Sequence, residues 1–184
     1  MTPIPHPTVH LRALEPEDLS LLYTIENDRN LWSVSNTSAP YSRYALRNYI
    51  SQACGDIYKD GTLRLIIETA EQKSVGIIDI LSLDANDLRA EIGIAILEEE
   101  RRKGYARAAI TEVERYCRET LHLNMVYSEI AAHNAPCRRL FESLDYHLTA
   151  ELPGWYFKSG AYRSKCIYQK FFPNLRQNFL PQRK

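Results

Sequence analysis

One segment decides the fold of this chain: Ile92-Gly93-Ile94-Ala95-Ile96-Leu97-Glu98-Glu99-Glu100-Arg101-Arg102-Lys103-Gly104-Tyr105-Ala106-Arg107. Its apolar start is typical of a strand, its charged middle of a loop, and its end opens a helical period. Unpaired main-chain N–H groups and the helix dipole favour an anion at a helix N-terminus, and glycine permits close approach. The segment therefore predicts an anion-binding junction, with a plain solvated basic loop as the alternative.

The charges and spacing of this loop narrow the kind of anion site. Four basic side chains would reinforce it: Arg101, Arg102, Lys103 and Arg107. The glycine-lysine-hydroxyl run of a nucleotide P-loop is missing, and so is the three-glycine dinucleotide fingerprint. The loop therefore predicts a phosphate site outside these two common classes.

The rest of the chain predicts a mixed α+β domain around one sheet. Upstream, β-like runs at 62–69, 75–83 and 89–96 are joined by short turns, which favours an antiparallel meander. A strand at 9–14 and helices at 15–27 and 42–53 precede them, and a helix to about 121, a strand at 125–130, a helix at 135–144 and strands at 147–152 and 162–171 follow. We expect a single domain over 1–184, with a core at about 9–172 and a polar tail at 173–184.

Composition excludes several classes of protein. The 184 residues carry 23 basic and 23 acidic side chains, so no long-range field attracts nucleic acid. No apolar run approaches the roughly 18 residues of a membrane span, and the N-terminus lacks a secretory signal, which predicts a cytoplasmic protein without a membrane partner. The four cysteines have no metal or redox spacing, so we expect neither a metal nor a disulfide.

Four motifs in the right order give a resemblance to a known family. Arg101-x-x-Gly104-x-Ala106 resembles the acyl-CoA pyrophosphate loop of the GNAT superfamily of N-acetyltransferases. The stretch 134–146 is similar to the motif after the fifth strand of that superfamily, where an asparagine precedes a helix that packs against CoA. The stretches 88–94 and 156–163 resemble the fourth strand and the final hairpin of its ribosomal-protein and spermidine acetyltransferase branch. The resemblance implies a GNAT-like fold, a mixed and mostly antiparallel sheet of about seven strands with about four flanking helices.

The same resemblance implies a site for acetyl-CoA as co-substrate. The backbone of Ile94, Ala95 and Ile96 would pair with the pantetheine arm, and one amide would polarise the thioester carbonyl. The pyrophosphate would lie on Arg101, Arg102, Lys103, Gly104, Tyr105, Ala106 and Arg107, and the following helix would pack against the coenzyme through Asn134, Cys137 and Phe141. A nucleophilic role for Cys137 has no histidine partner nearby, so a small packing residue is the stronger interpretation.

The implied reaction is direct acetyl transfer in a ternary complex to a primary amine of a small molecule or a protein N-terminus. An alkyl amine with a pKa of ~10.4 is protonated near neutral pH, so a base must act. Glu91 is the candidate, against the alternative of a strand-surface glutamate paired with Arg89 or another cation. Asn134 would fix a pantetheine amide or a water, cap a helix, or do both.

One departure from the family motif concerns the leaving thiolate. Phe141 stands where many members carry a tyrosine that protonates it, so either Tyr146 or Tyr105 supplies the proton or the thiolate leaves as an anion. Asp145 replaces the usual glycine, which predicts a distorted turn or an aspartate in the left-handed region. These departures leave a catalytically silent CoA-binding module as the alternative function.

The acceptor side of the site is less specific in sequence. The residues we expect there are Glu26, Asp28, Trp32, Tyr41 and Tyr156, as acids that attract a cation or as an aromatic slot; packing is the alternative for the aromatic side chains. Ser38-Ala39 precede Pro40-Tyr41 where the spermidine enzymes have an acidic pair, which argues against a polyamine acceptor. The sequence does not identify the amine, and a sheet edge near the last strands predicts a possible homodimer.

Overall fold

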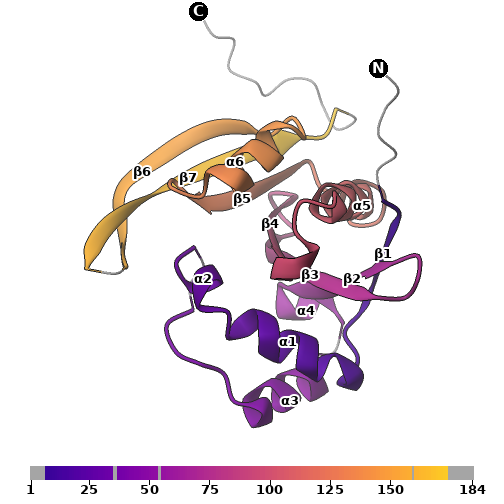
Figure 1. The fold of residues 1–184 in the computed structure, drawn as a ribbon. Coiled ribbons are helices and arrows are strands. Elements are labelled where there is room, and N and C mark those ends of the chain that lie inside the picture. The colour runs from indigo at the N-terminus through magenta and orange to yellow at the C-terminus, as the bar shows by residue number, and fades with distance from the viewer. Residues whose placement is uncertain (1–6, 35–36, 54, 159, 174–184) are drawn as a thin grey trace, which may run out of the picture.

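The computed structural model describes residues 7–34, 37–53, 55–158 and 160–173. A seven-stranded sheet runs through this part of the chain in the order β1-β2-β3-β4-β5-β7-β6, and all neighbours are antiparallel except β4 and β5 (Figure 1). The strands are β1 (Val9–Ala13), β2 (Leu63–Thr69), β3 (Ser74–Asp84), β4 (Arg89–Ile96), β5 (Met125–Ala131), β6 (His147–Lys158) and β7 (Ala161–Phe171). The predicted mixed, mostly antiparallel GNAT-like sheet is confirmed.

Helices lie on both faces of the sheet. The helical elements are η1 (Pro16–Asp18), α1 (Leu19–Glu26), α2 (Arg29–Trp32), α3 (Arg43–Gln52), α4 (Ile57–Asp60), η2 (Glu98–Glu100), α5 (Tyr105–Glu119) and α6 (Ala135–Glu142). One buried cluster joins α1 and α3 to the sheet through Leu22, Ile25, Leu46, Ile50, Ile66 and Ile77. The larger cluster lies on the opposite face, where α5 contributes Ile110 and Val113 and α6 contributes Phe141.

Two features of the chain differ from the sequence prediction. The linker after α1 contains a one-turn helix, α2, and a second one-turn helix, α4, follows α3. The sixth strand extends beyond the predicted end at 152 to Lys158, with a register shift between Leu152 and Tyr156. Pro153 and Gly154 lie in this shift, where a missing ladder hydrogen bond is tolerated because β6 pairs with β7 alone among the described strands.

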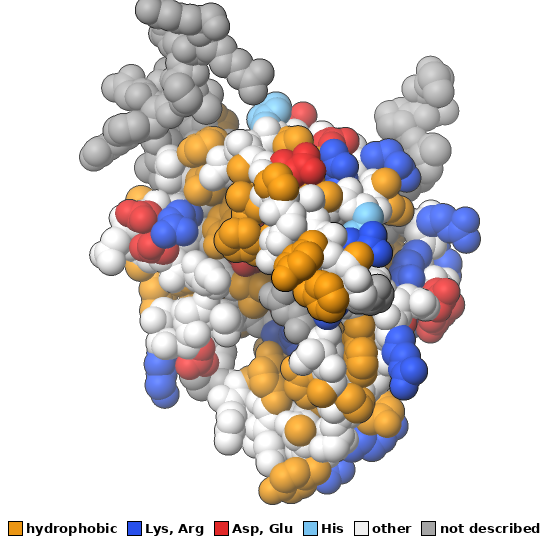
Figure 2. Space-filling view, turned by 90° about the vertical axis from the view of Figure 1, so that its left-hand side faces the viewer, with side chains coloured by type: hydrophobic (Ala, Val, Ile, Leu, Met, Phe, Trp, Pro, Cys, Tyr) orange, Lys and Arg blue, Asp and Glu red, His pale blue; other side chains and the backbone are white. Residues whose placement is uncertain are grey.

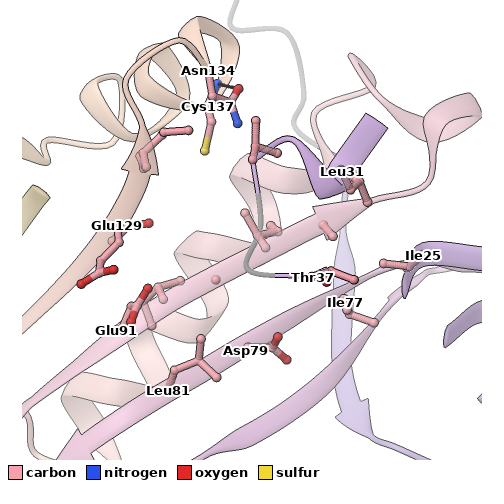
Figure 3. Close-up of a pocket in the computed structure, with 18 of the residues that line it drawn as sticks. Ile25, Leu31, Thr37, Ile77, Asp79, Leu81, Glu91, Glu129, Asn134 and Cys137 are labelled. Atoms are coloured by element: carbon pink, nitrogen blue, oxygen red, sulfur yellow. Dashed lines mark hydrogen bonds between the residues drawn. The ribbon is translucent and has the colours of Figure 1, made fainter. Parts of the chain in front are cut away.

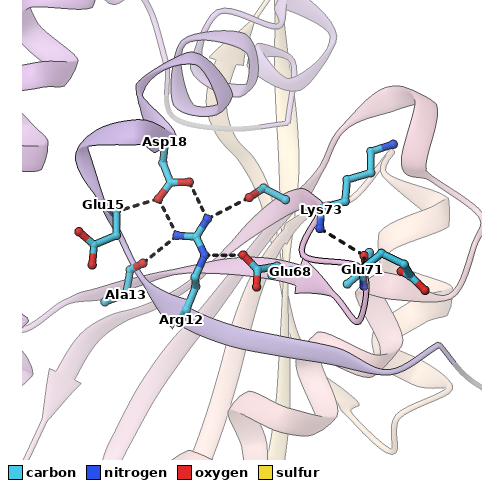
Figure 4. Close-up of polar contacts among 9 residues, drawn as sticks. Arg12, Ala13, Glu15, Asp18, Glu68, Glu71 and Lys73 are labelled. Carbon is cyan, nitrogen blue, oxygen red and sulfur yellow. Dashed lines mark hydrogen bonds and ion pairs between the residues drawn. The ribbon is translucent and has the colours of Figure 1, made fainter.

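Arg12 fixes the N-terminal strand to its surroundings. Its guanidinium donates to both Asp18 carboxylate oxygens, at 2.7 and 2.8 Å, to Glu68 Oε2 at 2.7 Å and to Ser74 Oγ at 3.0 Å (Figure 4). The nearby turn carries Lys73, whose ammonium reaches buried Glu100 in η2. Arg12 therefore links the edge strand β1 to the start of β3, and Lys73 links the turn before β3 to the charged loop after β4.

The described helices include none with the length and apolar character needed to cross a membrane. Cys117, Cys137 and Cys166 are free thiols. Of the predicted tail, only Pro173 is among the described residues, and 174–184 lie outside them, as does Cys54.

Candidate active site

The parallel strands β4 and β5 pair over three residues and then separate. Their register runs from Arg89↔Met125 to Glu91↔Tyr127, whereas both strands continue beyond it. A cavity of about 270 Å³ occupies the opening and is lined by Gly93, Ile94 and Ala95 from β4 and by Ser128 to Ala131 from β5. It connects the α1 face of the sheet with α6 on the other face, so two reactants can meet through the sheet.

The loop between β4 and α5 exposes a row of main-chain donors. Arg102 and Gly104 adopt positive φ values of 64° and 89°, and α5 begins at the next residue. Within the described chain, no residue accepts a hydrogen bond from the main-chain N–H groups of 102–107. Such a turn at a helix N-terminus forms an anion-binding concavity.

The basic side chains of this loop are engaged with the protein. Arg101 donates to the Ile96 carbonyl at 3.1 Å and pairs with Asp28 at 3.3 Å. Lys103 pairs with Glu100 at 2.8 Å, and Arg107 donates to the Ser143 carbonyl at 3.1 Å. These three cations therefore shape the loop, and the amides are the groups left to meet a phosphate, with Arg102 exposed beside them.

The coenzyme-side residues predicted from sequence come together at the opening. Ile94, Ala95, Asn134, Cys137 and Phe141 line the cavity, while Ile96 is buried and is not among the lining residues. Figure 3 shows Asn134 and Cys137 on α6, facing the strands across the cavity. Asn134 Oδ1 accepts a hydrogen bond from the Cys137 N–H at 3.3 Å, which confirms that it caps α6. Burial raises the pKa of the Cys137 thiol to about 12, so the thiol is protonated near neutral pH.

Glu91 lies in the cavity next to the point where the strands separate (Figure 3). Burial, and after it the neighbouring Glu129 carboxylate, raise the pKa of its carboxyl to about 7. Lys165 and a main-chain N–H of Glu129 act in the opposite direction. The cation beside Glu91 is Lys165, which forms an ion pair with Glu129 at 2.5 Å. Arg89 pairs with Asp84 and Asp87 instead.

The other half of the cavity is polar and aromatic. Arg64 donates to both Asp79 oxygens at 2.8 Å and to Glu26 Oε1 at 2.6 Å. Trp32 lines the cavity and donates its indole N–H to the Glu26 carbonyl at 2.7 Å. Tyr156 contributes a buried hydroxyl with no hydrogen-bond partner among the described residues.

Three predicted site residues lie elsewhere. Asp28 caps α2 and pairs with Arg101 instead of lining the cavity. Tyr41 is 44% exposed and bonds through its main chain to Asn27. Tyr146 is buried in the core against the Phe141 ring, with a centroid distance of 4.8 Å, so the structure does not bring its hydroxyl to the opening.

Sequence reasoning also missed part of the cavity wall. The missed polar residues are Thr37, Arg64, Asp79, Ser128, Glu129 and Lys165. For Glu129 a signal existed, because alternation along 125–130 places it on the same face as Tyr127, but the others depend on which strands become neighbours. Asp145, in contrast, has a φ of 64°, which confirms the predicted aspartate in the left-handed region.

A parallel strand pair that separates and leads to exposed main-chain N–H groups at a helix N-terminus is the arrangement that the resemblance to the GNAT superfamily implies for an acyltransferase that takes a coenzyme A thioester. The chain belongs to the family described as the acetyltransferase (GNAT) domain, whose model matches residues 8–147. The protein is thus an N-acetyltransferase that uses acetyl-CoA.

Named relatives agree with this assignment. The chain is 26% identical to spermidine N(1)-acetyltransferase of Vibrio cholerae over 153 residues, 83% of this chain and 87% of the relative. It is 25% identical to the Escherichia coli protein of the same name, with 88% and 87% covered. A solved structure of the Vibrio cholerae enzyme with CoA and spermine matches the fold with a TM-score of 0.82 at 24% identity, covering 89% of this chain and 95% of that one.

Proposed function

We propose that the protein acetylates a primary amine of a small, positively charged molecule of the polyamine type, by direct attack within a ternary complex. The observation that carries the proposal is the position of Glu91, in the cavity that joins the β4–β5 opening to an acidic second half. Its pKa of about 7 suits a general base that works near neutral pH.

The chemistry begins with the loss of a proton from the acceptor. An alkylammonium of pKa ~10.4 must lose one before its nitrogen has a lone pair to donate. Glu91 takes that proton directly or through one water. The nitrogen then forms a bond to the thioester carbonyl carbon, the carbon–sulfur bond breaks, and the electron pair leaves on sulfur. The nitrogen loses its second proton to solvent, which leaves the neutral amide. One main-chain N–H group within Ile94 to Ile96 stabilises the carbonyl oxygen as it gains charge.

Direct attack is favoured over an acyl-enzyme because of the state of Cys137. A thiolate is the nucleophilic form of cysteine, and a thiol pKa of about 12 leaves almost none of it near neutral pH. Asn134, which caps α6 through its carbonyl oxygen, can still offer its amide group to the pantetheine arm. Cys137 and Phe141 then serve as packing surfaces for the coenzyme.

The departing sulfur needs no tyrosine in this scheme. Phe141 has no proton to give, and the Tyr146 hydroxyl lies in the core, where burial and the Glu114 carboxylate raise its pKa. Because a thiol has a pKa of ~8.5, the thiolate can leave as an anion and take a proton from solvent. Departure of an unprotonated thiolate is slower than departure assisted by a nearby acid. Family membership favours an active enzyme over a catalytically silent CoA-binding module.

The charge balance of the cavity supports a cationic acceptor. Four carboxyl groups line it, those of Glu26, Asp79, Glu91 and Glu129, against two basic groups, those of Arg64 and Lys165. An excess of acid in a low-dielectric cleft attracts a cation. The named spermidine acetyltransferase relatives support the same class of acceptor, even though Ser38 and Ala39 replace the acidic pair expected there.

The test is release of free thiol from acetyl-CoA in the presence of spermidine, spermine, a diamine, an aminoglycoside and an N-terminal peptide. Glu91→Gln should lower kcat by about 100-fold or more while calorimetry shows unchanged acetyl-CoA binding. Glu151→Gln, at an exposed carboxylate on β6, is the matched control and should behave as wild type. Binding without turnover across the panel contradicts the proposal, and turnover with the peptide alone contradicts its acceptor class.

Self-association through the last two strands is part of the same proposal. The β6–β7 hairpin exposes Leu148, Trp155, Phe157 and Phe171, and Figure 2 shows hydrophobic side chains gathered at the centre of that side of the molecule. A related spermidine N-acetyltransferase of Vibrio cholerae has a dodecameric structure. Light scattering should give a mass above the 21.3 kDa of one chain, and Trp155→Glu should reduce it.

A further inference from the structure

An ion pair beside Glu91 has no role in the scheme above. Lys165 on β7 and Glu129 on β5 line the same cavity as Glu91 on β4, and their charged groups are 2.5 Å apart. The Lys165 side chain is only 14% exposed, and its ammonium also lies 5.9 Å from the Trp155 ring centroid. A lysine this enclosed, within an amine-binding cavity, is costly unless it is paired.

Strand register places the three groups on one face of the sheet. Glu91 is opposite Tyr127, so Glu129, two residues further along β5, points to the same side. Ala131 is opposite Lys165 in the antiparallel β5–β7 ladder, which brings Lys165 to that side as well. The arrangement is therefore fixed by three adjacent strands and does not depend on a loop.

We infer that the Lys165–Glu129 ion pair is a positioning device that holds the Glu129 carboxylate beside Glu91, so that Glu91 is the carboxyl group that exchanges the proton. This inference rests on the proposed role of Glu91 as the base. Two neighbouring carboxylates compete for one proton, and an ammonium that is bound to one of them decides which group holds it.

The two partners act on Glu91 in opposite directions. The Glu129 carboxylate raises the pKa of Glu91, and the Lys165 ammonium lowers it. Loss of Glu129 should therefore make Glu91 a stronger acid, and loss of Lys165 should make it a weaker one. A pair with a purely structural role would produce the same kind of damage whichever partner was removed.

The other charged and titratable groups around Glu91 are paired within the protein or neutral near pH 7. They are Arg89 on its own strand, Asp79 on β3, Tyr127 on β5, Tyr156 on β6, and Glu26 of α1 with Arg64 of β2. Arg64 is bound by both Asp79 and Glu26, and Arg89 by Asp84 and Asp87. Burial and the Glu91 charge raise the pKa of Tyr127, and burial raises that of Tyr156, so both are neutral near pH 7.

The experiment is the pH dependence of kcat/KM for Glu129→Gln, Lys165→Met and the double variant, with spermidine as acceptor. The enzyme is active when Glu91 is ionised, so activity falls as pH drops through its pKa. Glu129→Gln should move this acidic limb to lower pH by about one unit, and Lys165→Met should move it to higher pH by about the same amount. The double variant should return near wild type, and Lys165→Arg should keep the wild-type profile.

NMR of the Glu91 carboxyl carbon in the free protein measures the pKa of Glu91 directly in the two single variants and the double variant. Because this measurement needs no turnover, it also works for an inactive variant. Opposite displacements in the two single variants support the inference. If Glu91→Gln abolishes the acidic limb, Glu91 is the base, and the inference is then overturned when both single variants shift its pKa in the same direction or neither shifts it. If Glu91→Gln keeps both turnover and the limb, the proposed function fails instead.

Discussion

The two halves of the active site are built in different ways. The coenzyme half comes from one contiguous stretch, in which β4, its loop and the start of α5 supply main-chain groups from 94 to 107. The acceptor half gathers single side chains from elements far apart in sequence, such as Glu26, Arg64, Asp79, Glu129 and Lys165. A main-chain site tolerates many side chains, whereas a side-chain site changes with each substitution, so the acceptor half is where specificity can vary.

The largest effect should come from Arg64, which holds the acceptor half together. Arg64→Met leaves Asp79 and Glu26 without their shared cation, and an unpaired carboxylate in a cleft costs about 3 kcal/mol of unfolding free energy. We expect a higher KM for the amine with an unchanged affinity for acetyl-CoA. Arg115→Met removes an exposed pair on α5 as a control and should cost less than about 1 kcal/mol.

Denaturant unfolding and steady-state kinetics on the two variants check this prediction. An equal loss of affinity for amine and coenzyme would contradict the division into two halves. A stability loss as small as that of the control would mean that Asp79 and Glu26 are solvated without Arg64.

The second effect concerns the coenzyme half alone. Gly104 has a φ of 89°, and a Cβ there would lie 2.9 Å from Pro7 Cδ. Gly104→Ala therefore forces the loop out of its conformation, and a strain of about 1–2 kcal/mol corresponds to roughly 10-fold weaker acetyl-CoA binding. Gly61→Ala introduces the same left-handed strain at a φ of 67° with no atom within 4 Å, so it should destabilise the fold and leave calorimetric acetyl-CoA binding unchanged.

The third prediction concerns Glu91, which lies where the two halves meet. Its folded-state pKa of about 7 is above the ordinary 4.5, so the stability it contributes is fully present below pH 4.5 and is lost as pH rises through 7. Glu91→Gln should therefore stabilise the protein at pH 8, by roughly 1–2 kcal/mol after allowance for solvent screening, and not at pH 4.5. Thermal unfolding at both pH values checks this, and equal changes at both would contradict it.

The same contrast explains what the sequence could predict. The loop after β4, the capping role of Asn134 and the left-handed Asp145 are local, so motif and spacing were enough. Arg64 and Lys165 enter the cavity only because seven strands adopt one register, which no short pattern encodes. The one-turn helices α2 and α4 were missed because four residues do not establish a helical period.

Asp28 provides the smallest and most specific test of the comparison. It was predicted on the acceptor side, yet its Oδ2 pairs with Arg101 of the coenzyme loop while its Oδ1 caps α2. Asp28→Asn keeps the cap and removes the charge, so only the support of Arg101 is weakened. Because a partly exposed pair is worth about 0.2–1 kcal/mol, acetyl-CoA should bind about 1.4- to 5-fold more weakly.

The matched control for Asp28 is Asp56→Asn, which keeps an equivalent cap on α4, where the carboxylate accepts from the Tyr58 and Lys59 amides. It should leave both substrates unaffected. If Asp28→Asn instead raises the KM for the amine and leaves acetyl-CoA binding intact, Asp28 belongs to the acceptor half, as the sequence suggested. Which ligand binds more weakly therefore assigns Asp28 to one half, because acetyl-CoA binds the coenzyme half and the amine binds the acceptor half.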